Sequence, residues 1–181
     1  HTRKLFFHAY IQPDVDYAST CWDLCSQNVV KPLERLYKRS VKIILLKSNS
    51  PLAKDFKEIN ILPFDLRCRF NKGILIYKIM KNLTPSYLQE KFTLSKSRYK
   101  SKLFIPRPRT NLYMSSFTYS GAKLWNELEE QLKIKNSLSS FKRAFFKHLL
   151  DNYKWYGRYL ETFFSFLLPK LCLLVVLQRQ G

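Results

Sequence analysis

The chain has 181 residues, of which 46% are hydrophobic and 15% aromatic, with only four glycines. This is the composition of a globular domain with a real core. Lysine and arginine number 32 against 13 acidic residues, which gives a formal net charge of +19. Such an excess predicts an anionic partner, either nucleic acid or a membrane surface; a basic but merely solvated surface is the alternative.

The cysteines and histidines are too scattered to predict a metal centre, and no cofactor is expected. Cys21 and Cys25 lie four residues apart, but no second pair and no nearby histidine completes a zinc set. Thiols in a reducing compartment are the default. The chain starts at His1 without the charged-then-apolar pattern of a signal peptide, so we expect an intracellular fragment of something longer.

The hydrophobic pattern predicts a mainly α fold, a small domain of several short amphipathic helices. Thr2 to Tyr10 has a short helical pattern that Pro13 stops. Further helices are expected over 29–47, after Ser50-Pro51, over 65–81 and after Thr84-Pro85. Asp65 is a candidate cap for the longest of these internal helices.

The segment 29–47 is the most informative for chemistry. A helix advances about 100° per residue. Lys31, Arg35, Lys38 and Lys42 therefore fall on one stripe, with Arg39 at its flank, while the opposite, docking face carries Leu33, Leu36, Tyr37, Ile43 and Ile44. The apolar face is expected to pack against the rest of the domain, and the other face to present its cations to solvent or a ligand.

A polar, basic loop containing Arg98 leads into an extended, proline-rich segment over 103–110. Pro106 and Pro108 exclude a helix interior there, so at most a short strand is expected. The stiff backbone could space Arg107 and Arg109 to meet phosphates. A surface connector is an equal alternative.

The stretch from Tyr119 to Leu150 is predicted to organise the core as two amphipathic helices joined by a polar link. Ser120 is a candidate cap for the first helix and Ser137 or Asn136 for the second. The predicted core residues of the whole chain are Trp22, Leu33, Leu36, Leu124, Trp125, Leu128, Phe141 and Phe145.

The composition changes after Leu150, so residues 1–150 are expected to form the domain and 151–181 an unassigned aromatic and apolar tail. Within the tail, 163–177 is strongly apolar but interrupted by Pro169-Lys170. A bilayer span needs roughly 20 residues with few charges. A packed terminal helix or an unrelated tail is therefore favoured over a membrane helix.

An ordered string of short motifs runs through the domain and resembles the thumb and post-palm region of Jockey-type non-LTR (LINE) retrotransposon reverse transcriptases. The resemblance covers roughly residues 5–150. Its motifs are Ile11-Gln12-Pro13, Asp16-Tyr17, Trp22, Leu33-Glu34-Arg35-Leu36, Lys38-Arg39, Ile43-Ile44, Ile61-Leu62-Pro63 with Arg67, Tyr77-Lys78-Ile79, Pro85, Tyr87-Leu88, Arg98, Ile105-Pro106, Arg109-Thr110, Gly121-Ala122, Leu124-Trp125-Asn126 and Phe141-Lys142. The family usually has proline after Leu128, where this chain has Glu129, which suggests a drifted copy.

The resemblance implies an RNA-directed DNA polymerase as the parent protein, with RNA and DNA as partners, acting in the nucleus and cytoplasm within a ribonucleoprotein. Polymerase chemistry needs paired metal-binding aspartates, and this sequence has no Asp-Asp pair. No endonuclease constellation is present either. The chain is therefore expected not to be an enzyme by itself, but to grip a template–primer backbone without reading its sequence.

The predicted nucleic-acid-binding residues are Lys31, Arg35, Lys38, Arg39, Lys42, Arg98, Arg107 and Arg109. Two alternatives stay open. One is a membrane-associated basic protein held by residues 163–177 and its basic faces. The other is a degenerate, transposon-derived chain without a working partner.

Overall fold

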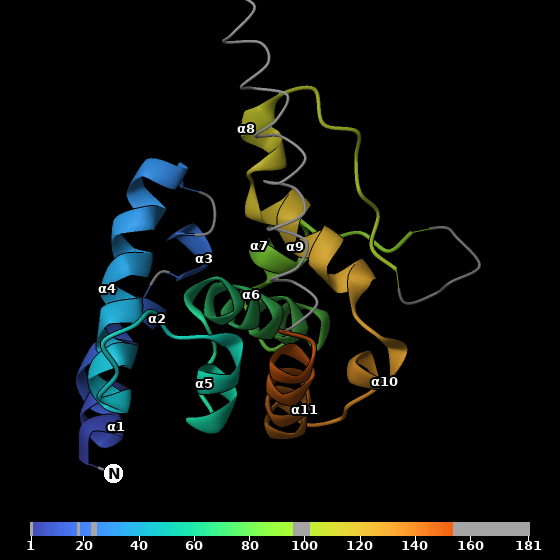
Figure 1. Ribbon diagram of the computed structural model, residues 1–181. Helices are drawn as coiled ribbons and strands as arrows, with labels where there is room; N and C mark the ends of the chain where they lie inside the picture. Colours follow the sequence, from blue (N-terminus) through green and yellow to red (C-terminus); the bar gives the residue numbers. More distant parts are fainter. Residues whose placement is uncertain (1, 18, 23–24, 96–101, 154–181) are drawn as a thin grey trace, which may run out of the picture.

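The computed structural model describes residues 2–17, 19–22, 25–95 and 102–153. This part of the chain is mainly helical, as predicted (Figure 1). In place of a strand, the described residues contain one isolated antiparallel bridge between Leu94 and Leu103. The apolar segment 163–177 lies outside the described residues.

Most helices follow one another through short connections, and a longer segment joins α7 to α8. The N-terminal part contains α1 (Thr2–Phe6), the π-helical turn η1 (Phe7–Ile11), α2 (Gln12–Asp16), α3 (Ser19–Trp22) and the long α4 (Gln27–Leu45). The middle contains α5 (Ala53–Glu58), α6 (Phe64–Met80) and α7 (Ser86–Gln89). After the extended segment come α8 (Asn111–Met114), α9 (Phe117–Glu127), α10 (Glu130–Lys133) and α11 (Leu138–Asp151).

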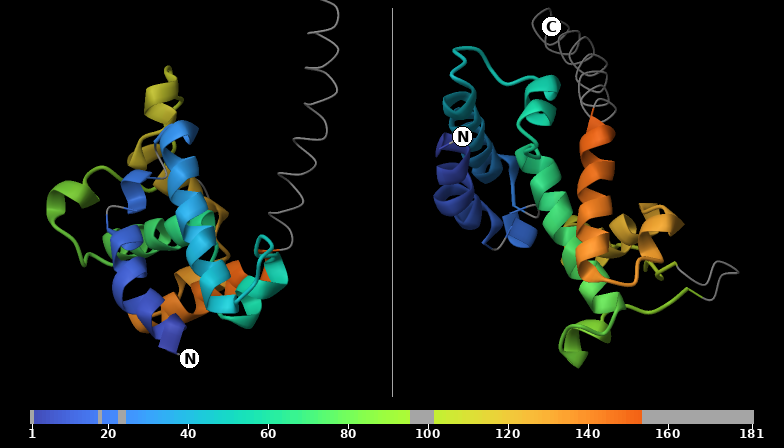
Figure 2. Two further views of the ribbon diagram at one scale, coloured as in Figure 1. Left: turned by 60° about the vertical axis from the view of Figure 1, so that its left-hand side comes forward. Right: turned by 90° about the horizontal axis from the view of Figure 1, so that it is seen from below.

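Helix α6 lies at the centre and separates two hydrophobic clusters. The first cluster packs α6 against α9, α10 and α11 and includes Ile76, Tyr77, Trp125, Phe141 and Phe145. The second cluster packs the start of α6 against η1, α4 and α5 and includes Phe7, Tyr37, Val41, Phe56 and Phe64. The right-hand view of Figure 2 shows α6 between α4 and α11. Since α6 contributes to both clusters, it joins the two halves of the described chain.

The core predicted for the C-terminal helices is present. Leu124, Trp125, Leu128, Phe141 and Phe145 are all buried, and all but Leu124 belong to the first cluster. The aromatic rings of Tyr77 and Phe141 stack with centroids 4.2 Å apart. Offset ring stacking adds to the burial of apolar area, so these rings fix how α11 sits on α6.

Helix starts agree with the predicted caps in one case and differ in two. The Ser137 hydroxyl accepts from the Ser140 N–H at 3.2 Å, as expected for a cap of α11. Helix α9 begins earlier than predicted, because Ser116 rather than Ser120 caps it. Asp65 lies in the first turn of α6, whose N-cap position is Pro63.

Candidate nucleic-acid interface

Helix α4 is docked through a single face that is centred on Tyr37 and Val41. Both side chains are buried, at 1% and 0% exposure. The Tyr37 hydroxyl donates to the main-chain oxygen of Leu62 at 2.7 Å, and its ring makes edge contacts with Phe7 and Phe64. Burial raises the pKa of the Tyr37 hydroxyl, which therefore stays a neutral donor. These contacts fix the rotation of α4 about its axis.

The fixed rotation turns the predicted cationic stripe outward. Lys31, Arg35, Lys38 and Arg39 are exposed, and Lys42 is half-buried at the stripe's end. Five cations stand against one carboxylate on this helix, Glu34, which pairs with Lys38 at 2.6 Å. One such exposed i,i+4 pair contributes only about 0.3–0.5 kcal/mol, so Lys38 can exchange it for a phosphate. The face therefore remains strongly positive.

The assignment of Leu36 to the core was wrong. Its side chain is 60% exposed, because it lies about 100° from Tyr37 around the helix and outside the docked face. Ile43, also expected on that face, is 58% exposed for the same reason. Leu33 is half-buried and packs against the second cluster. The docked side of α4 was predicted correctly, but the predicted face was centred too close to Leu36.

Two of the other predicted cations, Arg107 and Arg109, lie away from the α4 stripe. Arg107 and Arg109 are exposed on the extended segment 102–110. This segment lies on the opposite side of the molecule from α4 in Figures 1 and 2. Arg98 lies outside the described residues, as does the side chain of Trp22. Those predicted nucleic-acid-binding residues that the structure describes thus form two separate surfaces.

Arg67 of α6 serves the fold instead of a surface. Arg67 binds the Asp16 carboxylate through two nitrogens, at 2.7 Å and 2.5 Å, and the Asn71 amide donates to the same carboxylate at 2.8 Å. Burial alone would raise the pKa of Asp16, but hydrogen bonds and charge from Arg67, with Asn71, lower it below its usual value. This ionised group ties α2 to α6.

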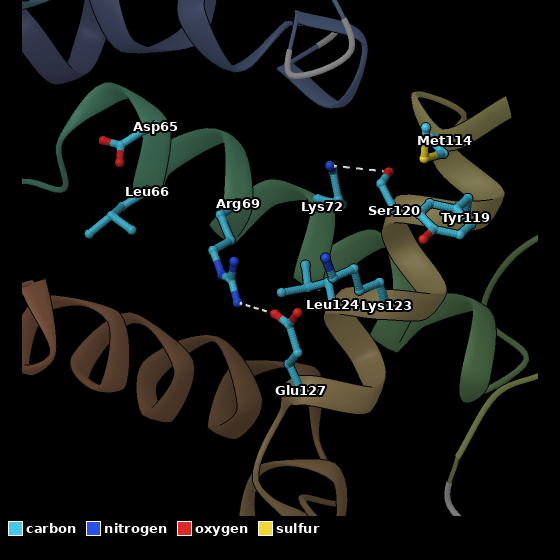
Figure 3. A pocket seen from close by; sticks show the side chains of 10 residues that line it. All are labelled: Asp65, Leu66, Arg69, Lys72, Met114, Tyr119, Ser120, Lys123, Leu124 and Glu127. Carbon is cyan, nitrogen blue, oxygen red and sulfur yellow. Dashed lines mark hydrogen bonds and ion pairs between the residues drawn. The ribbon is translucent and has the colours of Figure 1, made fainter. Parts of the chain in front are cut away.

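A pocket of about 400 Å³ opens between α6 and α9 (Figure 3). Arg69 at its wall binds Glu127 at 2.8 Å, and the largely buried Lys72 donates to the Ser120 hydroxyl at 3.3 Å. Asp65 and Glu127 put two carboxylates among its cations. This mixed charge suits a phosphate less well than the exposed face of α4.

Asn126, which is not among the predicted site or core residues, holds the start of the extended segment. Its side-chain oxygen accepts from the Leu103 N–H at 2.8 Å, and its side-chain nitrogen donates to the Leu103 oxygen at 2.9 Å. The partners are 23 residues apart. No local sequence pattern predicts such a pair; the signals present were a polar residue beside Trp125 and its place in the motif Leu124-Trp125-Asn126.

Among the residues that the structure describes, no helix is long and apolar enough to cross a bilayer. Comparison with known proteins adds no relative: neither family models, nor curated proteins, nor solved structures give a match for this chain.

Proposed function

We propose that this chain is a non-catalytic nucleic-acid-binding region of a retrotransposon reverse transcriptase, which grips a template–primer duplex through α4. The observation that carries the proposal is the two-sided character of this helix. Tyr37 and Val41 anchor one side in the second cluster, and the cations on the other side face outward. A long, rigid, cationic surface is what a phosphate backbone requires of its partner.

The spacing of the stripe suits repeated contacts with a backbone. Lys31, Arg35, Lys38 and Lys42 recur at intervals of three and four residues, about one helical turn or 5.4 Å. Such contacts neutralise phosphates and release condensed counterions, and they carry no base information. The proposed binding is therefore strong at low salt, weak at high salt and indifferent to sequence.

Support for the reverse transcriptase assignment comes from the ordered motifs. Several of their residues make contacts between distant parts of the chain. Asp16 binds Arg67, and Asn126 binds the main chain of Leu103. Such contacts hold distant segments of the chain together. Proteins that share this fold would need the same residues at these positions, so the motifs would recur among them. This chain would bind the template–primer backbone, while the acidic metal site of the polymerase would lie in another part of the parent protein.

The proposal is tested by measuring the affinity of the full chain for two duplexes of unrelated sequence and for an RNA–DNA hybrid, at several salt concentrations. We expect similar affinities for the two sequences and a steep loss with salt. Strong preference for one sequence, or no binding at low salt, would overturn it.

Sedimentation with anionic vesicles is the second arm. Vesicle binding without duplex binding would favour the membrane alternative.

A further inference from the structure

The extended segment 102–110 is held in a fixed conformation at its start. Leu103 is buried at 2% exposure, and Asn126 binds both its main-chain N–H and its main-chain oxygen. The next N–H, that of Phe104, donates to the Thr93 oxygen at 2.8 Å. Three consecutive main-chain groups are therefore occupied, and the backbone cannot rotate without breaking these bonds.

This backbone holds the Phe104 side chain outside the protein. The flanking Leu103 is buried, and Ile105 is partly buried against the first cluster. Successive side chains of an extended chain point to opposite sides, so Phe104 faces outward and is 57% exposed. A large aromatic ring is thus presented to solvent on a pre-organised backbone, although burying it would stabilise the fold by about 1.5–3 kcal/mol.

Cations follow the ring along the same segment. Arg107 and Arg109 are both exposed, and Pro106 and Pro108 keep the chain extended between them. At about 3.1 Å per residue, Arg107 lies roughly 9 Å beyond Phe104, and Arg109 roughly 6 Å further. An exposed ring followed along the chain by exposed cations is the kind of arrangement with which proteins bind single strands, by stacking on bases and by contacting phosphates.

We propose that the segment 102–110 binds single-stranded nucleic acid, with Phe104 stacked on a base and Arg107 and Arg109 on the adjoining phosphates. A single strand fits because its base faces are accessible, whereas those of a duplex are covered by neighbouring base pairs. The inference rests on the proposed function only in taking nucleic acid as the partner. Its surface is separate, on the side of the molecule opposite α4 (Figure 1), so a duplex and a single-stranded region can be held together.

The test compares two fluorescently labelled single strands of equal length, one ordinary and one made of abasic sites, which keeps the phosphates but has no bases. The full chain and its Phe104→Ala variant are titrated with each strand. We expect Phe104→Ala to weaken binding of the ordinary strand roughly 5- to 150-fold, the value of one stacked base, and to leave the abasic strand unaffected. Phe104→Trp should keep the affinity and add emission that only the ordinary strand quenches.

Tyr87→Ala is the matched control, because Tyr87 is an exposed aromatic residue on another element, α7. It should leave both affinities unchanged. Equal losses for the ordinary and abasic strands, or no loss with Phe104→Ala, would overturn the stacking role, and the second result would point to a protein partner instead. Duplex affinity is measured in parallel. Its absence would contradict the proposed function of α4 without affecting the Phe104 result.

Discussion

Asn126 acts as a substitute for a neighbouring strand, because its amide satisfies both main-chain polar groups of the buried Leu103. We predict that Asn126→Ala lowers the free energy of unfolding by about 1–3 kcal/mol, the cost of leaving buried polar groups unsatisfied. Urea unfolding measures this loss. Asn111→Ala, at an exposed position on α8, is the control and should change little. An unchanged midpoint for Asn126→Ala would show that water replaces the amide.

The Asp16 carboxylate gives the fold an acid-sensitive contact. Because its pKa in the folded chain lies below the usual value of about 4, the ionised group stabilises the fold above that pH, and the stabilisation is lost as pH falls through the folded-state pKa. We predict that Asp16→Asn costs roughly 1–3 kcal/mol at neutral pH, since Arg67 is left without its carboxylate in a partly buried site. Thermal unfolding from pH 7 to pH 2 should show the two proteins converging below about pH 4. A constant difference across that range would contradict this role.

At the scale of elements, the crossing of α6 and α11 depends on Gly73. A Cβ at this position would lie 2.3 Å from a ring carbon of Phe145, which is fully buried. We predict that Gly73→Ala destabilises the protein by about 1–3 kcal/mol through overpacking, although alanine favours a helix by about 1 kcal/mol. Denaturant unfolding of the wild type and the Gly73→Ala variant measures whether the free energy of unfolding falls or rises. A stabilised variant would mean that Phe145 can move aside.

Most helices could be predicted from the sequence, because the 3.6-residue period is a local signal. The stop predicted at Pro13 was wrong, since α2 contains this proline in its first turn. The orientation of each helix was harder to predict. Leu36 was assigned to the core because a broad apolar face does not reveal its own centre; that centre is set by Phe7 and Leu62, which contact Tyr37 from distant segments. The stripe of α4 was foreseeable, since cations at helical spacing stay together however the helix is rotated.

The partners of the charged residues on α6 also depend on distant segments of the chain and could not be predicted from the sequence. Arg67 and Arg69 of this helix bind carboxylates 51 and 58 residues away in the chain. Pairing over such separations depends on the tertiary arrangement and leaves no periodic signal. The net charge of the chain therefore overstates the positive charge that the surface offers to a partner.

At the scale of the whole molecule, α6 joins the two hydrophobic clusters and keeps the proposed duplex and single-strand surfaces on opposite sides. Binding by the α4 stripe predicts a specific response to charge removal. The stripe variant replaces Lys31, Arg35, Lys38 and Lys42 with Gln. Its matched control replaces the exposed residues Lys123, Lys142, Arg143 and Lys147, also three lysines and one arginine.

The most direct measurement is the dependence of duplex affinity on salt for wild type and both variants. Log affinity falls with log salt at about −0.9 for each phosphate neutralised. If all four stripe residues contact phosphates, the stripe variant should flatten the slope by roughly 3–4 units, while the control changes it far less. Equal changes in the two variants, or an unaltered slope in the stripe variant, would contradict duplex binding by α4.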